Sequence, residues 1–129
     1  MRNNFSEFLL SPTGFELHGR QMRLQIRLPW YRALPLSVVE IGCLRLDGVE
    51  VPIGDIRITV NGRTVAASAL GELTDEVWYV LDDALLEATL PAAPSGPAPH
   101  TVELTLKLFP PYIPGLAWVT QSSRAYRAT

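Results

Sequence analysis

The sequence predicts an all-β protein, namely a single-domain antiparallel β-sandwich that covers residues 1–129 and has at most one short helical turn. In several runs apolar residues recur at every second position, which is the period of a strand with one buried face. Turn dipeptides such as Asn61-Gly62 separate these runs. No window keeps a helical period of 3.6 residues. Many short strands joined by turns are typical of a sandwich or a barrel, and we favour two packed antiparallel sheets.

The first half of the chain contains two strong strand candidates. Residues 22–28 alternate apolar side chains with arginine and glutamine, whereas residues 5–10 and 15–17 are weaker candidates. The second strong candidate covers residues 38–46. Its apolar pattern slips by one position beside Gly42, which predicts a β-bulge. A turn at Asp47-Gly48 follows.

A hairpin and one helical turn are predicted next. Residues 56–60 should pair antiparallel with residues 63–66 across Asn61-Gly62, because this dipeptide accepts the positive φ angles of a two-residue turn. Residues 68–73 predict the helical turn, with Ser68 as its N-cap and Gly71 keeping it short.

The last third of the chain predicts more strands. Residues 76–81 and 85–90 look like two more strands, joined at Asp82-Asp83. The proline-rich residues 91–99 predict a stiff loop, because too little chain follows for a second domain. Strands at residues 102–108 and 117–127 complete the prediction.

The net charge, the cysteine count and the lack of long apolar runs exclude several classes of protein. The chain has 129 residues and a formal net charge of −2, so it has no broad basic surface for nucleic acid. Its only cysteine is Cys43, which excludes a disulfide within one chain. No apolar run reaches transmembrane length, and the first residues lack the apolar core and cleavage site of a signal peptide. We expect no membrane partner and a cytoplasmic location.

The titratable residues offer no catalytic or metal-binding pattern. His18 and His100 have no ligand-forming neighbour at metal-binding spacing, so we expect structural or solvent-exposed roles for both. Cys43 lies within an apolar strand pattern and is expected to act as a small hydrophobic residue. The adjacent Asp82 and Asp83 would point to opposite sides of a strand, so a turn role is expected. We therefore predict no catalytic residue, no metal ligand and no cofactor in this chain.

Two segments rich in aromatic residues and proline carry the candidate site. Residues 28–40 place Trp30, Tyr31 and Arg32 between prolines, and residues 109–118 place Tyr112 and Pro114 in a similar setting. Proline fixes φ and removes hydrogen-bond donors, which predicts surface loops. Rigid rings lose little entropy on binding, so these five residues are predicted to form a partner interface or the rim of a pocket. An alternative stays open for both segments, in which the rings fold back and cover the core.

Several runs, in this order and spacing, resemble the small β subunit of bacterial C-glycoside deglycosidases. They cover much of residues 14–114, and the most specific are LPWYRALPLSVVE at 28–40, LDGVEVPIGDIRITVNGRTV at 46–65 and FPPYIP at 109–114. The resemblance implies a β-sandwich that acts as the non-catalytic accessory subunit of a lyase complex. It implies a TIM-barrel α subunit, similar to sugar-phosphate isomerases and epimerases, in an αβ hetero-oligomer.

The resemblance also implies where the chemistry takes place. The α subunit would hold a divalent metal of the Mn or Mg type and cleave the C–C glycosidic bond of 3-oxo-C-glycosides. The keto group makes the neighbouring C–H acidic, so that a base can start the elimination.

Two other functions fit the residues. The first is a free-standing carbohydrate-binding β-sandwich module, whose surface rings would stack on sugars. The second is a self-associating structural domain that would use an exposed strand edge.

Overall fold

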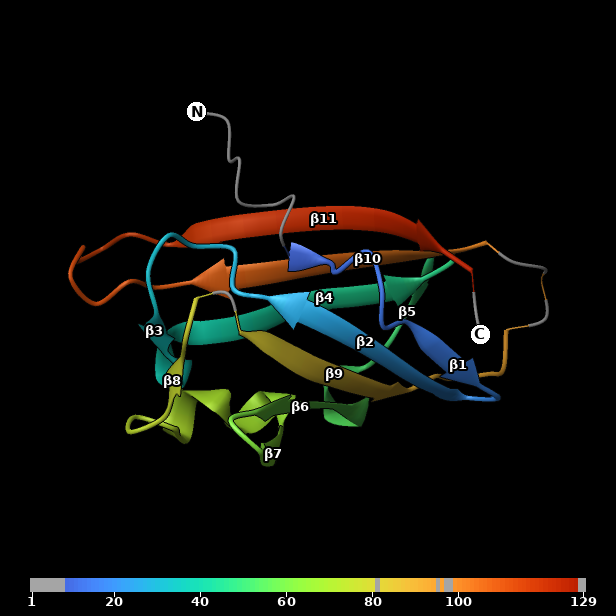
Figure 1. Ribbon diagram of the computed structural model, residues 1–129, viewed down its shortest axis with the longest axis horizontal. Coiled ribbons are helices and arrows are strands. Elements are labelled where there is room, and N and C mark those ends of the chain that lie inside the picture. The colour runs from blue at the N-terminus through green and yellow to red at the C-terminus, as the bar shows by residue number, and fades with distance from the viewer. Residues whose placement is uncertain (1–8, 81, 95, 97–98, 128–129) are drawn as a thin grey trace.

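Two antiparallel sheets pack together in the computed structural model, which describes residues 9–80, 82–94, 96 and 99–127 (Figure 1). The first sheet has the strand order β1 (Glu16–His18), β2 (Gln21–Arg27), β9 (Asp83–Thr89), β6 (Ile56–Val60) and β7 (Arg63–Ala66). The second has the order β11 (Trp118–Tyr126), β10 (His100–Leu108), β4 (Val39–Leu46) and β5 (Val49–Glu50). A short ribbon pairs β3 (Leu34–Pro35) with β8 (Val77–Trp78). The predicted all-β class is confirmed.

The core lies between the two sheets and follows the alternation in the sequence. Along β10 the buried side chains are Val102, Leu104, Leu106 and Leu108. Along β2 they are Met22, Leu24 and Ile26, while the arginines and glutamines between them are exposed or half-buried. Full burial of each such side chain contributes about 1.5–3 kcal/mol, so these strands are a large part of the stability.

The predicted bulge in β4 is confirmed. Cys43 pairs with Thr105 and Ile41 pairs with Leu106, so Gly42 has no partner in the ladder. A Cβ atom at Gly42 would lie 3.3 Å from the carbonyl oxygen of Thr105, which is a tight contact. Glycine therefore relieves crowding at the point where the strand shifts register.

The predicted β6–β7 hairpin is also confirmed. Val60 pairs with Arg63, which leaves Asn61 and Gly62 as the two-residue turn. Both have positive φ, 55° and 78° respectively. These angles are those required by a type I′ turn, whose twist matches that of the flanking strands.

The described residues contain three 3-10 helices among their named elements. The longest, η3 (Ala67–Glu72), coincides with the predicted helical turn, although no side chain caps it. The sequence analysis did not predict η1 (Leu36–Val38) or η2 (Ile53–Asp55). Each of these follows a proline, whose fixed φ near −60° starts the turn.

The strand predicted at residues 85–90 corresponds to β9, whereas the strand predicted at residues 76–81 is reduced to two residues. Among the described residues of that range, Val77–Trp78 alone form a strand, and they pair with β3. Strand β9 instead begins at Asp83 and pairs with β2 and β6. Trp78 is fully buried and its indole Nε1 donates a hydrogen bond to the carbonyl oxygen of Asp82, at 3.0 Å. Burial of this ring fixes a turn before Asp82 and separates the two segments.

The two ends of the described chain meet. The weak prediction at residues 15–17 corresponds to β1, and the predicted last strand corresponds to β11. The prediction at residues 5–10 falls mostly outside the described residues, but Leu10 forms a single antiparallel bridge with Ile26. The Tyr126 hydroxyl donates to the carbonyl oxygen of Ser11 at 2.5 Å, so β11 is held against the first segment.

Candidate functional site

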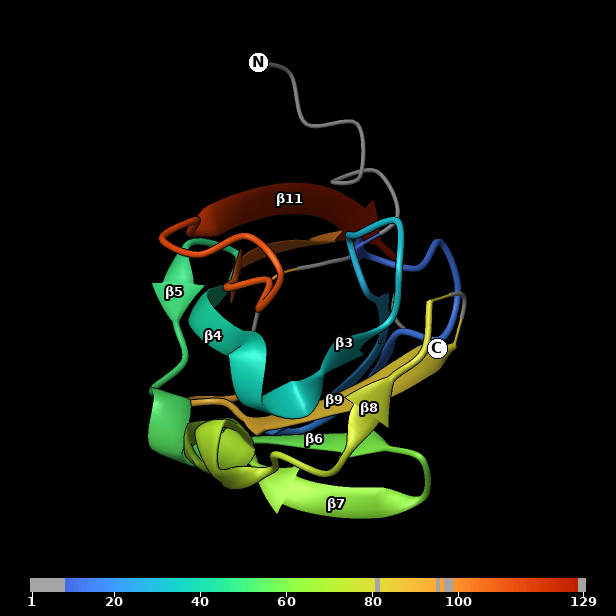
Figure 2. The ribbon, with the colours of Figure 1, turned by 90° about the vertical axis from the view of Figure 1, so that its left-hand side faces the viewer.

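The two predicted aromatic segments lie at the same end of the sandwich. Residues 28–33 connect β2 to β3, and residues 109–117 connect β10 to β11. Figure 1 places both connections at its left-hand side, and Figure 2 shows this end facing the viewer. The sequence thus brings together residues that are far apart in the chain, because both connections leave strands at the same edge of the core.

Tyr112 is the centre of a set of contacts between the two connections. The indole Nε1 of Trp30 donates a hydrogen bond to the Tyr112 hydroxyl at 2.5 Å. The guanidinium carbon of Arg32 lies 4.9 Å from the centroid of the Tyr112 ring, within cation–π range. The Tyr31 ring lies 5.1 Å from that of Trp30. Trp30, Tyr31, Arg32, Tyr112 and Trp118 are called the aromatic cluster below.

Trp30 does not have the surface placement that the sequence predicted. Its side chain is only 6% exposed, so the alternative interpretation, a ring that covers the core, is the one observed. The ring packs edge-on against Trp118, with centroids 5.5 Å apart and an interplanar angle of 68°. Burial of the large apolar ring of Trp30 is favourable, and the Tyr112 hydroxyl accepts a hydrogen bond from the indole Nε1, which is the one polar atom of the ring. A role of Trp30 in a partner interface stays a prediction. In that role, Trp30 would hold Tyr112 in position through their hydrogen bond.

The exposed part of the aromatic cluster consists of Tyr31, Arg32 and Tyr112. Tyr31 is 53% exposed and Tyr112 is 42% exposed. A hydrogen bond with Tyr112 is the main cause that raises the pKa of Tyr31 above its ordinary value, and desolvation adds to it. The Tyr31 ring therefore carries a neutral hydroxyl at physiological pH. Arg32 is exposed and forms no ion pair with a carboxylate of the described residues, so its charge is available to an anion.

Pro114 lines a shallow pocket beside the cluster. This pocket has a volume of about 370 Å³ and is walled by Phe109, Pro110, Ile113 and other residues of the same connection. A second pocket of about 420 Å³ shares Phe109 and extends to Ser37 and Glu40. The exposed side chains at this end thus continue into two hollows, of which the one beside Pro114 is mainly apolar.

The sequence analysis did not select Trp118 as a site residue. It lies at the first position of β11, and its indole Nε1 is buried with no hydrogen-bond partner among the described residues. Its position in the second aromatic segment was visible in the sequence. Its contact with Trp30 was not, because that contact depends on how the two sheets pack.

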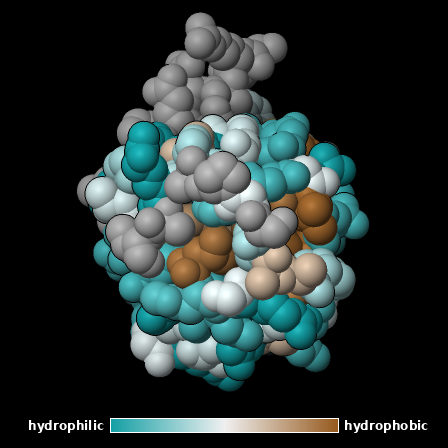
Figure 3. Space-filling view, turned by 90° about the vertical axis from the view of Figure 1, so that its right-hand side faces the viewer, coloured by the Kyte–Doolittle hydropathy of each residue, from teal (hydrophilic) through white to brown (hydrophobic). Residues whose placement is uncertain are grey.

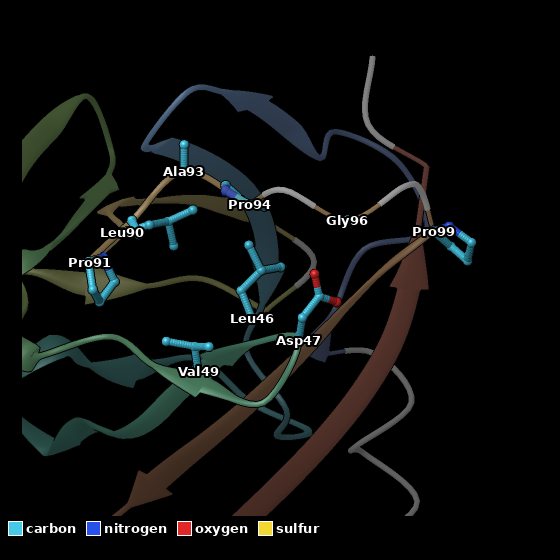
Figure 4. Close-up of a pocket in the computed structure, with 10 residues that line it drawn as sticks. Leu46, Asp47, Val49, Leu90, Pro91, Ala93, Pro94, Gly96 and Pro99 are labelled. Atoms are coloured by element: carbon cyan, nitrogen blue, oxygen red, sulfur yellow. The ribbon is translucent and has the colours of Figure 1, made fainter.

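A third pocket lies at the opposite end of the sandwich. Its volume is about 450 Å³, and its walls come from Leu46, Asp47, Val49, Leu90 and the proline-rich loop (Figure 4). Figure 3 shows apolar atoms gathered in a hollow at this end. Two of its lining residues, Leu46 and Leu90, are buried core residues. The pocket is therefore an extension of the core beneath the loop.

Asp47 uses its carboxylate to join the β4–β5 turn to β10. One oxygen lies 2.8 Å from Nδ1 of His100, and the other accepts the backbone N–H of Thr101 at 2.8 Å. The hydrogen bond with His100, followed by that from Thr101, lowers the pKa of Asp47 below its usual value. His100 is buried, so the structural role predicted for it is confirmed. Asp47 itself has φ of 51°, as the predicted turn requires.

The remaining candidates for chemistry have structural surroundings. The described residues contain no group of three His, Cys, Asp or Glu side chains that could hold a metal ion. Desolvation is the main cause that raises the pKa of the Cys43 thiol, which disfavours the reactive thiolate. Asp83 forms an ion pair with Arg27 at 2.7 Å, on β9 rather than in the predicted turn. None of the helices in the described ranges has the length and apolar character of a membrane span.

Comparison with known proteins finds one family. A model of the family described as C-glycoside deglycosidase beta subunit matches residues 11–112. A C-glycoside deglycosidase beta subunit of Arthrobacter globiformis is 42% identical over 90 residues, which cover 70% of this chain and 68% of the relative. The 3'-dehydrocarminate deglycosidase beta subunit of a Microbacterium species is also 42% identical over 90 residues, with 70% and 67% covered. A C-glycoside deglycosidase beta subunit of Microbacterium trichothecenolyticum is 36% identical over 95 residues, with 74% and 71% covered.

Proposed function

The chain belongs to the C-glycoside deglycosidase beta subunit family, and we propose that it is the non-catalytic accessory subunit of a C-glycoside deglycosidase-like lyase complex. Its task is to stabilise an α subunit and to shape the entrance to that subunit's pocket. The α subunit of the proposal is a TIM barrel similar to sugar-phosphate isomerases and epimerases, and the complex is cytoplasmic.

The proposal assigns the reaction to the α subunit. The complex cleaves the C–C glycosidic bond of 3-oxo-C-glycosides, where the keto group acidifies a neighbouring C–H. A divalent ion of the Mn or Mg type supplies charge stabilisation there. One relative is a 3'-dehydrocarminate deglycosidase beta subunit, and a 3'-dehydro sugar is a keto-sugar, which supports a keto-sugar as substrate. The described residues of this chain hold no group of three possible metal ligands, so the proposal places the ion in the partner.

The observation that carries the proposal is the convergence of four predicted site residues. Trp30 and Tyr112 are joined by a hydrogen bond, and Arg32 lies over the Tyr112 ring. Because these contacts hold the exposed rings in place before binding, a partner need not pay the entropy of ordering them. Aromatic rings and arginine are the residues most often found at the energetic centre of protein interfaces. The Arg32 guanidinium can also form a bidentate pair of hydrogen bonds with a carboxylate of the partner, which a lysine cannot form.

Affinity measurements on the two-subunit complex test the proposal. The α subunit of the proposal is expressed together with this chain, and the two are purified as the complex. Tyr31→Ala and Tyr112→Ala should each weaken the association by about 2 kcal/mol or more, which is roughly thirtyfold in Kd. Val49→Ala is the matched control, since Val49 is 55% exposed but lies in β5 near the opposite end. Its Kd should be unchanged.

Two results would reject the assignment. If the Kd is the same for wild type, both tyrosine variants and Arg32→Ala, with all of them folded, the aromatic cluster does not bind the partner. If the purified chain alone binds oligosaccharides at micromolar to millimolar concentrations and captures no barrel, the free-standing carbohydrate-binding module replaces the accessory subunit. Turnover by the purified chain in the absence of any α subunit would also contradict a non-catalytic role.

A further inference from the structure

A hollow lies between β4 and η3, at the end of the sandwich that carries the aromatic cluster. It has a volume of about 420 Å³ and is called the β4–η3 hollow below. Its walls come from η1, β4, η2, η3 and Phe109, the first residue of the β10–β11 connection. Figure 2 shows η1, η3 and this connection at the end that faces the viewer. The hollow and the aromatic cluster therefore belong to one end of the molecule.

The lining of the β4–η3 hollow is mostly apolar. Val39, Ile41 and Leu70 are buried core residues, whereas Ile53 and Phe109 are 43% and 41% exposed. Apolar walls with a few polar groups are typical of a binding pocket of this size. The hollow has room for at least one large apolar side chain from outside the chain.

Phe109 joins the hollow to the rest of this end. It also lines the pocket that contains Pro114, and its backbone N–H donates to the carbonyl oxygen of Val38 at 2.9 Å, which holds it beside η1. Eight large apolar side chains are exposed in the described part of the chain. Five of them belong to the hollow, the Pro114 pocket or the aromatic cluster, namely Tyr31, Ile53, Phe109, Tyr112 and Ile113. Exposed apolar surface gathered in this way is typical of a surface that a protein partner covers.

Glu40 gives the hollow its charge. Among the described residues that line the hollow, it is the one charged side chain, and it is exposed. It forms no ion pair with a described residue. Lys107 faces Glu40 in the ladder, but its Cε would lie 3.6 Å from a Cβ atom at Gly42, so its side chain runs beside the bulge. The Glu40 carboxylate is therefore available to a cation from outside the chain.

We propose that the β4–η3 hollow is a second docking point for the α subunit, and that it receives an apolar side chain next to an arginine or lysine of that subunit. The apolar side chain packs against Leu70 and Phe109, and the basic group pairs with Glu40. This inference rests on the proposed function, because it concerns the same partner. The family also favours this occupant over a second copy of the chain, since a beta subunit has an alpha partner.

Filling the hollow tests the docking point. Ser68 and Gly71 both line it and are exposed, and a Cβ atom at Gly71 would have no atom within 4 Å. Ser68→Phe and Gly71→Leu should each raise the Kd of the purified two-subunit complex by about tenfold or more, because the added side chain occupies the space of the partner's. Ser123→Phe, at an exposed position of β11, is the matched control and should leave the Kd unchanged. Circular dichroism and urea unfolding of each free variant should match the wild type.

Removing the charge tests the predicted basic group. Glu40→Gln should raise the Kd by about two- to fivefold at low salt, and the difference should shrink at high salt because ions screen an exposed pair. Glu16→Gln is the control, since Glu16 is also an exposed carboxylate but lies in β1. An equal Kd for Glu40→Gln and wild type at low salt would contradict the basic group.

Cross-linking identifies the occupant. In a Cys43→Ser background, Ser68→Cys labelled with a benzophenone maleimide should cross-link to the α subunit of the purified complex, at a peptide with an apolar residue next to arginine or lysine. A cross-link between two copies of this chain would overturn the inference. An unchanged Kd for both Ser68→Phe and Gly71→Leu, while Tyr112→Ala weakens the complex, would overturn it and leave the proposed function intact. A raised Kd for the hollow variants alone would support it and remove the aromatic cluster from the interface.

Discussion

Replacing Tyr112 by phenylalanine removes the hydroxyl that accepts the indole N–H of Trp30 and that also hydrogen-bonds with Tyr31. The ring, its packing and its contact with Arg32 remain. The change therefore isolates the hydrogen bonds that tie the β2–β3 connection to the β10–β11 connection. The expected effect is a loss of folding stability without loss of fold.

The burial of Trp30 and Tyr112 determines how much folding stability Tyr112→Phe should remove. Trp30 is almost completely buried, and leaving a buried donor without its partner costs about 1–3 kcal/mol. Tyr112 is 42% exposed, so water can reach part of the vacated space and the cost falls toward the lower end of that range. We expect Tyr112→Phe to lower the free energy of unfolding by about 1 kcal/mol. That is a measurable fraction of the roughly 5–15 kcal/mol typical of a domain.

Urea unfolding followed by circular dichroism measures this loss, and a double-mutant cycle with Trp30→Phe assigns it. The two changes should be less than additive by about 1 kcal/mol, because either one removes the shared hydrogen bond. Tyr79→Phe serves as the control, since Tyr79 is exposed and its ring hydroxyl has no hydrogen bond in the described residues. Full additivity, within about 0.3 kcal/mol, would refute the idea that the two connections are held together by this contact.

Three further changes have expected outcomes. Asp47→Asn keeps the turn but removes a carboxylate whose pKa is lowered chiefly by His100. The carboxylate of Asp47 adds to the free energy of unfolding above its unfolded pKa of about 4, and this stabilisation is lost as the pH falls below that value. The free energies of unfolding of wild type and variant should therefore differ most at neutral pH and become equal in acid. Gly62→Ala, at φ of 78°, should cost about 1 kcal/mol in urea unfolding, whereas Gly54→Ala should have little effect. Leu104→Ala, in the centre of the core, should cost about 2–5 kcal/mol by the same measurement.

The elements that depend on local chemistry were predictable from the sequence. Alternation placed β2 and β10, because one buried face requires a period of two residues. The slip beside Gly42 placed the bulge, and Asn61-Gly62 placed the hairpin turn. Each of these depends on residues that are neighbours in the chain.

The elements that depend on distant packing were not predictable. Residues 76–81 have a strand-like pattern, but burial of Trp78 and pairing with the two-residue β3 limit the strand to Val77–Trp78. Trp30 lies between prolines, yet its ring is buried because Trp118 and Tyr112 receive it from a connection far along the chain. The sequence located the candidate site in two segments, and only the packed sheets determine which side chains face outward.

The contact between Trp30 and Tyr112 spans 82 positions of the chain. A polypeptide that has not yet docked β10 and β11 onto the rest of the sandwich cannot form it, because one of its two halves is still elsewhere. The aromatic cluster, which the proposed function makes the surface for the partner, is consequently a late product of folding. A partner that contacts the rings of both segments, rather than either segment alone, would bind the folded subunit and would not bind incomplete or misfolded chains.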